Sequence, residues 1–178
     1  MKHKVGKSSI SVILFLAGLC MLALALSPSI ASAKEFKYDK TPAFSVTYPN
    51  DWSDNPENAS KYNLLFSAKA AAGIPVINVQ VRDIPKGVAL EDIGKYYKKE
   101  ILDKEQEQNC PIISDKQTTL KDGTKANETI LKYKYQAWLP LQAVVIAVFK
   151  DNKWIRVDIH QAAHEDPSWD ILHTLKFK

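Results

Sequence analysis

Cysteine and glycine are both scarce in this chain, and each scarcity excludes a class of protein. The 178 residues contain two cysteines and six glycines. Only Cys110 lies beyond the first 33 residues, so that part of the chain has no internal disulfide and depends on an ordinary hydrophobic core. Six glycines leave little room for the loops that cradle phosphate groups in nucleotide-binding proteins.

The sequence also lacks the motifs of common catalytic sites. It has no G-x-S-x-G nucleophile elbow, no H-E-x-x-H zinc motif and no C-x-x-C pair. Cys110 stands before Pro111 without an activating motif, which is typical of a half-buried small hydrophobic residue. We therefore expect a protein that is not an enzyme.

The first 33 residues have the three parts of a secretory signal peptide. Residues 1–7 carry three lysines and no acid, residues 10–26 are mainly apolar, and residues 31–33 read Ala-Ser-Ala. We expect cleavage after Ala33, which leaves a single domain at 34–178 that is periplasmic or secreted. The alternative is that the apolar run, about 17 residues long and near the lower limit for a membrane span, is kept as a membrane anchor.

Charge is almost balanced once this leader is set aside. Three of the 24 lysines and arginines lie in the leader, so 21 basic residues stand against 20 acidic ones. No concentrated basic patch is present, and this argues against nucleic acid as a partner.

Hydrophobic periodicity predicts an α+β fold. Alternating or continuous apolar runs predict strands at 44–48, 64–66, 77–82, 129–136, 143–149 and 154–160, the fifth of them buried on both faces. The pair Asp122-Gly123 predicts a two-residue hairpin, and residues 51–60 are expected to form a loop. Short links between the later strands favour antiparallel pairing of neighbours, in a sheet of about six strands.

Two helices are expected to cover this sheet. Leu90, Ile93, Tyr97 and Ile101 recur at helical spacing, which predicts an amphipathic helix of about 18 residues. Asp166-Pro167 predicts the capped start of a short C-terminal helix.

This order of elements resembles the PsbP-like family, and bacterial periplasmic DcrB-like proteins look similar. The likeness is carried by FSVTYPNDW at residues 44–52 and ILHTLKF at residues 171–177. The resemblance implies a sheet flanked by helices, an α/β/α sandwich, and a non-enzymatic role in docking or assembly outside the cytoplasm. No functional residue of the family can be matched to a position in this chain.

One group of residues has the chemistry of a metal site. His160, His164, Glu165 and Asp166 fall within seven residues, and imidazole with carboxylate suits zinc or manganese. The spacing follows no metal motif, and Asp166 and Glu165 are equally explained by the start of a helix. A divalent metal site at His160, His164 and Glu165 is the alternative to solvated structural residues, and no other cofactor is expected.

A second group lies on the polar side of the predicted strands. These positions alternate with apolar ones, and the group comprises Asn78, Gln80, Arg82, Lys132, Lys134, Arg156, Asp158 and His160. If the strands are neighbours, the side chains form one weakly basic surface suited to a carboxylate, a glycan or an acidic protein. Arg82, Lys132, Lys134, Arg156 and Asp158 are its candidate ligand-binding residues. The competing interpretation is a solvated sheet face, or one covered in part by a helix.

These patterns favour an exported interaction or assembly module of the cell envelope that binds a protein or another envelope component. The alternative is a periplasmic protein that binds a metal or small ligand through residues 160–166. Membrane association is expected only if the leader is not removed.

Overall fold

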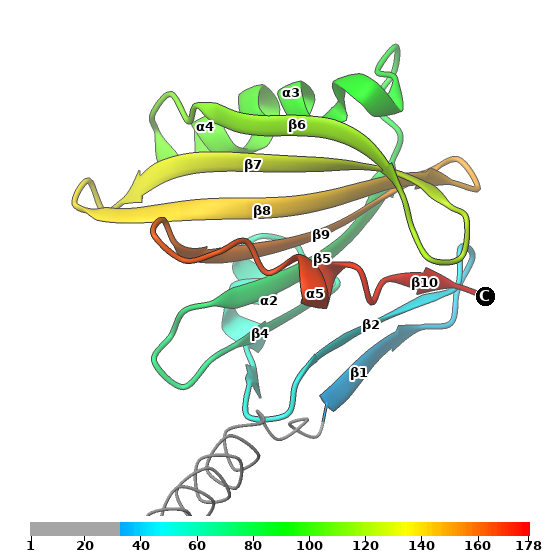
Figure 1. The fold of residues 1–178 in the computed structure, drawn as a ribbon, viewed down its shortest axis with the longest axis horizontal. Helices are drawn as coiled ribbons and strands as arrows, with labels where there is room; N and C mark the ends of the chain where they lie inside the picture. Colours follow the sequence, from blue (N-terminus) through cyan, green and yellow to red (C-terminus); the bar gives the residue numbers. More distant parts are fainter. Residues whose placement is uncertain (1–32) are drawn as a thin grey trace, which may run out of the picture. The chain divides into compact units, whose positions relative to one another are not determined.

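A computed structural model describes residues 33–178, and within them two antiparallel sheets and a helical layer are stacked (Figure 1). The larger sheet has seven strands in the order β3-β4-β5-β9-β8-β7-β6. Its strands are β3 (Ser53–Asp54), β4 (Phe66–Lys69), β5 (Val76–Asp83), β6 (Ile112–Thr119), β7 (Lys125–Tyr135), β8 (Leu139–Lys150) and β9 (Lys153–Ala162). The smaller sheet contains β1 (Ala33–Tyr38), β2 (Phe44–Pro49) and β10 (Lys176–Phe177), with β2 in the middle.

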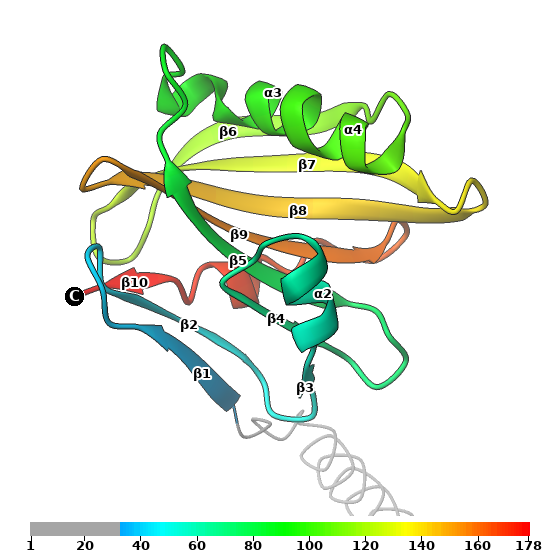
Figure 2. The same cartoon turned by 180° about the vertical axis from the view of Figure 1, so that it is seen from behind.

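The helices lie on both sides of the larger sheet (Figure 2). Residues 90–106 form one continuous helical segment, made of a 3₁₀ turn (Leu90–Asp92), α3 (Ile93–Tyr97), a π-helical turn (Lys98–Leu102) and α4 (Asp103–Gln106). This segment carries the chain from β5, next to β9, to β6 at the far edge of the sheet. α2 (Pro56–Lys61) lies on the same side, and α5 (Trp169–Leu172) lies on the opposite side, next to β10.

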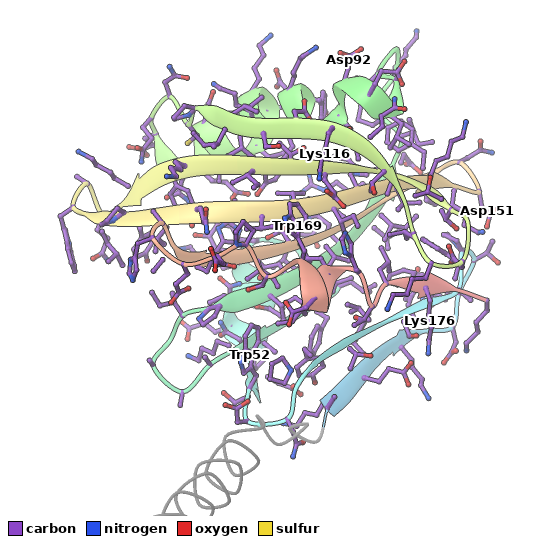
Figure 3. All side chains as sticks on the ribbon, in the orientation of Figure 1. Trp52, Asp92, Lys116, Asp151, Trp169 and Lys176 are labelled. Atoms are coloured by element: carbon purple, nitrogen blue, oxygen red, sulfur yellow. The ribbon has the colours of Figure 1, made fainter. Side chains whose placement is uncertain are left out.

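Two hydrophobic cores result from this stacking. One core lies between the two sheets and includes Phe44 and Leu172, both fully buried, and Trp52, which Figure 3 labels at the turn after β2. The other lies under the helical segment and includes Ile93, Tyr97 and Leu102. The larger sheet is therefore covered on both faces, and β8 is buried along nearly its whole length.

The structure confirms the α+β class and most of the expected strands. The helix expected from Leu90 is present, although it contains a π-helical turn in its middle. The larger sheet has seven strands rather than about six, and the layer opposite the main helices consists mostly of the smaller sheet. β1 was not expected at all, because its exposed and half-buried residues alternate without a clear apolar run.

Three local predictions were wrong. Residues 51–60 contain β3 and all of α2 except its last residue, instead of a loop. In the hairpin after β6 only Gly123 has a positive φ, of 86°, and the backbone of Leu120 pairs with Thr124 across a three-residue turn. Asp166 does not cap the C-terminal helix, which begins at Trp169 after Ser168. The two-residue turn with positive φ at both positions is Asp151-Asn152, between β8 and β9.

Helix-covered sheet face as the candidate functional site

β9 carries the polar side chains of this site because its residues alternate between the two cores. Ile155, Val157 and Ile159 point into the core between the sheets. Arg156 and Asp158 point the other way, toward the helical segment, and both are buried. The register places Arg156 opposite Gln80 and Asp158 opposite Asn78 of β5. The polar face of the strand is therefore covered by helices rather than solvated.

Asp158 lies at the centre of a buried polar network. Its Oδ2 accepts a hydrogen bond from Nδ2 of Asn78 at 2.9 Å and lies 2.8 Å from Nε2 of His160. Its Oδ1 lies 2.7 Å from Nε of Arg156, although the two groups are not aligned as a hydrogen bond. Burial alone would raise the pKa of Asp158, but the charge of Arg156 and the hydrogen bonds from His160 and Asn78 lower it to about 2.

The network continues outward to α2. Nδ2 of Asn58 and Oγ of Ser67 each donate a hydrogen bond to Oδ1 of Asn78, both at 2.9 Å. Nδ2 of Asn58 also lies 3.0 Å from Oγ of Ser67. These contacts join α2, β4 and β5 to the buried carboxylate of Asp158, and they fix the position of α2 on the sheet.

His160 connects Asp158 to Tyr133 of β7. The hydroxyl of Tyr133 lies 2.6 Å from Nδ1 of His160, while Nε2 of the same ring faces Asp158. A neutral ring protonated on Nε2 donates to Oδ2 of the carboxylate and accepts from the tyrosine, which gives both ring nitrogens and the phenol a partner. Burial raises the pKa of Tyr133 well above its usual value, so the phenol keeps its proton.

Arg156 is the one charged group of the network with unused donors. Its side chain is 5% exposed, and Nε and Nη1 have no hydrogen-bond partner within residues 33–178. Its guanidinium carbon lies 4.8 Å from the centre of the Tyr97 ring, on the helix above. A buried guanidinium that uses so few of its five N–H donors is uncommon in a structural ion pair.

A cavity of about 460 Å³ opens beside this network, between residues of α2 and α4 that line it. Asn78, Arg156 and His160 lie at its sheet side, and Tyr133 and Leu141 form part of its wall. The remaining lining residues are Asn55, Asn58, Lys61, Tyr62, Leu64, Lys69, Ala72, Gly73, Ile74, Val76, Glu105, Gln106, Tyr135 and Leu139. Cavities of a few hundred cubic ångströms with mainly apolar walls and a few convergent polar groups are typical of small-molecule sites.

The structure brings together only part of the predicted ligand-binding surface. Arg156 and Asp158 are adjacent, and Arg82 lies on the same face, although outside the cavity. Lys132 and Lys134 lie on the opposite face, because Lys132 pairs with Gln142 while the next residue, Tyr133, points toward the cavity. The expectation of one continuous basic surface is therefore wrong. Whether any of these residues binds a ligand stays a prediction.

The structure does not gather the predicted metal ligands. His160 faces the cavity, whereas His164 and Glu165 lie exposed in the turn after β9. Both ring nitrogens of His160 already face Tyr133 and Asp158. Between residues 33 and 178, no three His, Cys, Asp or Glu side chains are arranged to hold a metal ion.

Cys110 is buried in the core under the helical segment, away from the cavity. Burial and the neighbouring Asp103 raise the pKa of its thiol to about 12. The thiol is thus protonated at neutral pH and is not a nucleophile.

Within residues 33–178, no helix has both the length and the apolar character needed to cross a lipid bilayer.

Several cavity residues were not found from the sequence. The sequence pattern predicts that Tyr133 lies in a strand, but nothing in that pattern points to His160, 27 residues further along the chain. Asn58 lay in the segment expected to be a loop. The alternation of polar and apolar residues on β5 and β9 identifies Asn78, Asp158 and His160. It does not show that these side chains are buried.

Comparison with known proteins finds solved structures that share this fold at low sequence identity. No family model and no curated protein matches the sequence. The solution structure of cyanobacterial PsbP (CyanoP) from Synechocystis sp. PCC 6803 is similar, with a TM-score of 0.60 at 16% identity over 85% of this chain and 96% of that one. A crystal structure from Bacteroides thetaiotaomicron VPI-5482 has a TM-score of 0.52 at 12% identity, over 82% of this chain and 48% of the other.

The architecture is thus that of an α+β sandwich built on an antiparallel sheet. More specifically, the chain has a PsbP-like fold. This confirms the fold that the sequence predicted, while the likeness to DcrB-like proteins stays a prediction. At these identities the likeness concerns the fold alone, so the site has to be interpreted from its own residues.

Proposed function

We propose that this protein is an exported, non-catalytic interaction module of the cell envelope, and that it binds its partner component at the cavity between α2 and α4. The observation that carries the proposal is a cavity of about 460 Å³ beside a buried polar network. The PsbP-like fold is compatible with such a role in docking or assembly.

The residues at the cavity support binding rather than bond-making. Its lining contains no serine, threonine or cysteine that could act as a nucleophile. The pair of His160 and Asp158 resembles the base and orienting acid of a catalytic triad, but the hydroxyl in the third position belongs to Tyr133. Because burial raises the pKa of this phenol, His160 is a poor base for it, and the three groups instead hold the wall of the cavity rigid.

The export part of the proposal depends on residues 1–33, nearly all of which lie outside the described residues. The described fold begins with β1 at Ala33, so cleavage after this residue would leave β1 intact from Lys34 onward. In that strand, Nζ of Lys34 donates a hydrogen bond to the carbonyl oxygen of Trp52 at 2.7 Å. N-terminal sequencing of the protein from the envelope fraction is expected to begin at Lys34. A chain that keeps Met1 and remains in the cytoplasm would contradict export.

The binding part can be tested by filling the cavity. Val76 lines the cavity from β5, and tryptophan at this position is expected to occupy part of it. The matched control is Ile113→Trp, because Ile113 is 54% exposed on edge strand β6 and lies outside the cavity. The exported protein and both variants would be used to capture components of envelope extract, with thermal unfolding to show that each variant is folded.

A component retained by the wild type and Ile113→Trp but lost from Val76→Trp is the expected result. Equal retention by all three proteins would show that the cavity is not the binding site. If Val76→Trp does not fold, Ala72→Trp provides the same test, because Ala72 is an exposed residue of the β4–β5 turn and also lines the cavity.

A further inference from the structure

The charged and apolar residues that line the cavity indicate which chemical class of ligand it can bind. Three cationic side chains line it, those of Lys61, Lys69 and Arg156, against one acidic side chain, that of Glu105. Lys61 and Glu105 are exposed, so the cavity reaches the molecular surface between α2 and α4. Positive charge that lines a cavity with low-dielectric walls favours an anion.

Arg156 provides the specific recognition element. Its Nε faces Oδ1 of Asp158 at 2.7 Å, its Nη1 is buried without a hydrogen-bond partner, and the side chain lines the cavity. Asp158 balances the charge of Arg156 through Oδ1, while its Oδ2 is occupied by Asn78 and His160. The guanidinium is therefore held in place by Asp158 on its Nε side, while its terminal Nη1 has no partner. A planar guanidinium in this state is suited to a carboxylate, which it binds with paired N–H donors.

The apolar side chains that line the cavity indicate the chemistry of the part of the ligand that does not contact Arg156. Between the polar floor and the surface, the cavity is bordered by aromatic and aliphatic side chains, namely Tyr62, Leu64, Ile74, Tyr133, Tyr135, Leu139 and Leu141. An inorganic anion would leave these walls in contact with water, whereas an apolar or aromatic body would cover them. The cavity volume of about 460 Å³ is sufficient for such a body.

We infer that the cavity binds a small carboxylate with an apolar or aromatic body, its carboxylate directed to Arg156 and its body held between the tyrosine and leucine side chains. This inference rests on the proposed function and specifies the chemistry of its ligand. Glu105 is the acidic side chain of the lining, and its charge opposes the binding of an anion.

Calorimetric titration with acid and amide pairs tests this inference directly. Phenylacetate is compared with phenylacetamide, and 4-methylpentanoate with its amide, because each pair has the same body and differs in charge. We expect each acid to bind at least about tenfold more tightly than its amide, as an ionic hydrogen bond to a guanidinium would require.

Charge variants at the cavity mouth locate the site without disturbing the buried network. Lys61→Gln is expected to weaken phenylacetate binding by about two- to fivefold, and Glu105→Gln to strengthen it by a similar factor. Lys121→Gln, in the exposed turn after β6, is the matched control and is expected to change nothing. Arg156→Lys keeps the charge but removes the paired donors, and a loss of about tenfold or more is expected if the variant folds.

The outcomes separate this inference from the proposed function. If the amides bind as tightly as the acids, the inference is overturned, while the cavity remains a binding site for apolar groups. If acids bind but Lys61→Gln and Glu105→Gln have no effect, the carboxylate is bound elsewhere and the inference is also overturned. Absence of binding by any probe overturns it as well, and the capture experiment with Val76→Trp then decides the proposed function independently.

Discussion

The two faces of the larger sheet are stabilised in different ways. The face toward the smaller sheet is apolar along β9 and β5, and its residues Ile77, Val157 and Ile159 are fully buried. The face toward the helices has an ion pair and a hydrogen-bonded chain in the same two strands. Hydrophobic contacts tolerate imprecise packing, whereas a buried charge must keep its partners. The comparison indicates that the helix-covered face depends on specific polar contacts along β5 and β9, whereas the opposite face of these strands depends on apolar packing.

Removal of the negative charge of Asp158 should have the largest effect on the free energy of unfolding. Asp158→Asn leaves Arg156 buried without a counter-ion, and we expect a loss of about 3–5 kcal/mol, measured by urea denaturation. The double variant Arg156→Met/Asp158→Leu removes both charges and should recover most of this loss. If the double variant is as unstable as the single one, the ion pair is not what distinguishes this face.

The pH dependence of stability should follow from the same carboxyl group. The pKa of Asp158 is lowered from 3.8 to about 2 in the folded state, so its contribution is complete above pH 5 and is lost as the pH falls toward 2. The shift corresponds to about 2 kcal/mol. Urea denaturation between pH 5 and 2 should show this loss in the wild type, and a smaller slope in a folded Arg156→Met/Asp158→Leu variant. Equal slopes in the two proteins would contradict the assignment to Asp158.

The contact between helix and sheet offers a third test of the helix-covered face. A Cβ atom on Gly94 of α3 would lie 2.6 Å from Oδ1 of Asp115 and even closer to Oγ1 of Thr129. We expect Gly94→Ala to destabilise the protein by about 1–2 kcal/mol, although alanine favours a helix more than glycine does. Lys95→Ala, one residue along the same helix and exposed, is the control for helix propensity. A stabilised Gly94→Ala variant would mean that the helix can move away from the sheet.

The smallest effect is expected for the ion pair on the opposite face. Glu128 of β7 is buried and lies 3.0 Å from Nζ of Lys116, whose side chain is 62% exposed, as the position of Lys116 at the sheet surface in Figure 3 illustrates. Glu128 keeps a second partner, Nε2 of His173 at 2.6 Å. Lys116→Ala should therefore cost less than about 1 kcal/mol by urea denaturation. A loss comparable with that of Asp158→Asn would remove the distinction between the two faces.

The sequence predicted the strands well because their signal is local. The alternation of Ile155, Val157 and Ile159 with polar residues, and the continuous apolar run in β8, identify each strand without knowledge of its neighbours. β1 and α2 were missed because neither has a strong apolar period, and both are held by tertiary contacts such as that of Asn58 with Asn78.

The site was less predictable because burial of the polar face depends on a distant segment. Asp158 and Arg156 have the same alternation whether water or a helix covers them. The pairing of Lys132 with Gln142 decides which face its side chain joins, and this register is not evident from β7 alone. The meeting of Tyr133 with His160 likewise requires the order of β7, β8 and β9 in the sheet.

The position of β10 has a consequence for the timing of folding during synthesis. β2 lies near the start of the described chain, yet one of its two neighbouring strands is formed by residues 176–177, and Leu172 and Leu175 complete the core beneath it. The space between the two sheets thus stays open until these residues have left the ribosome. The apolar side chains of β2 therefore remain without one of their covering layers for most of the synthesis of the chain.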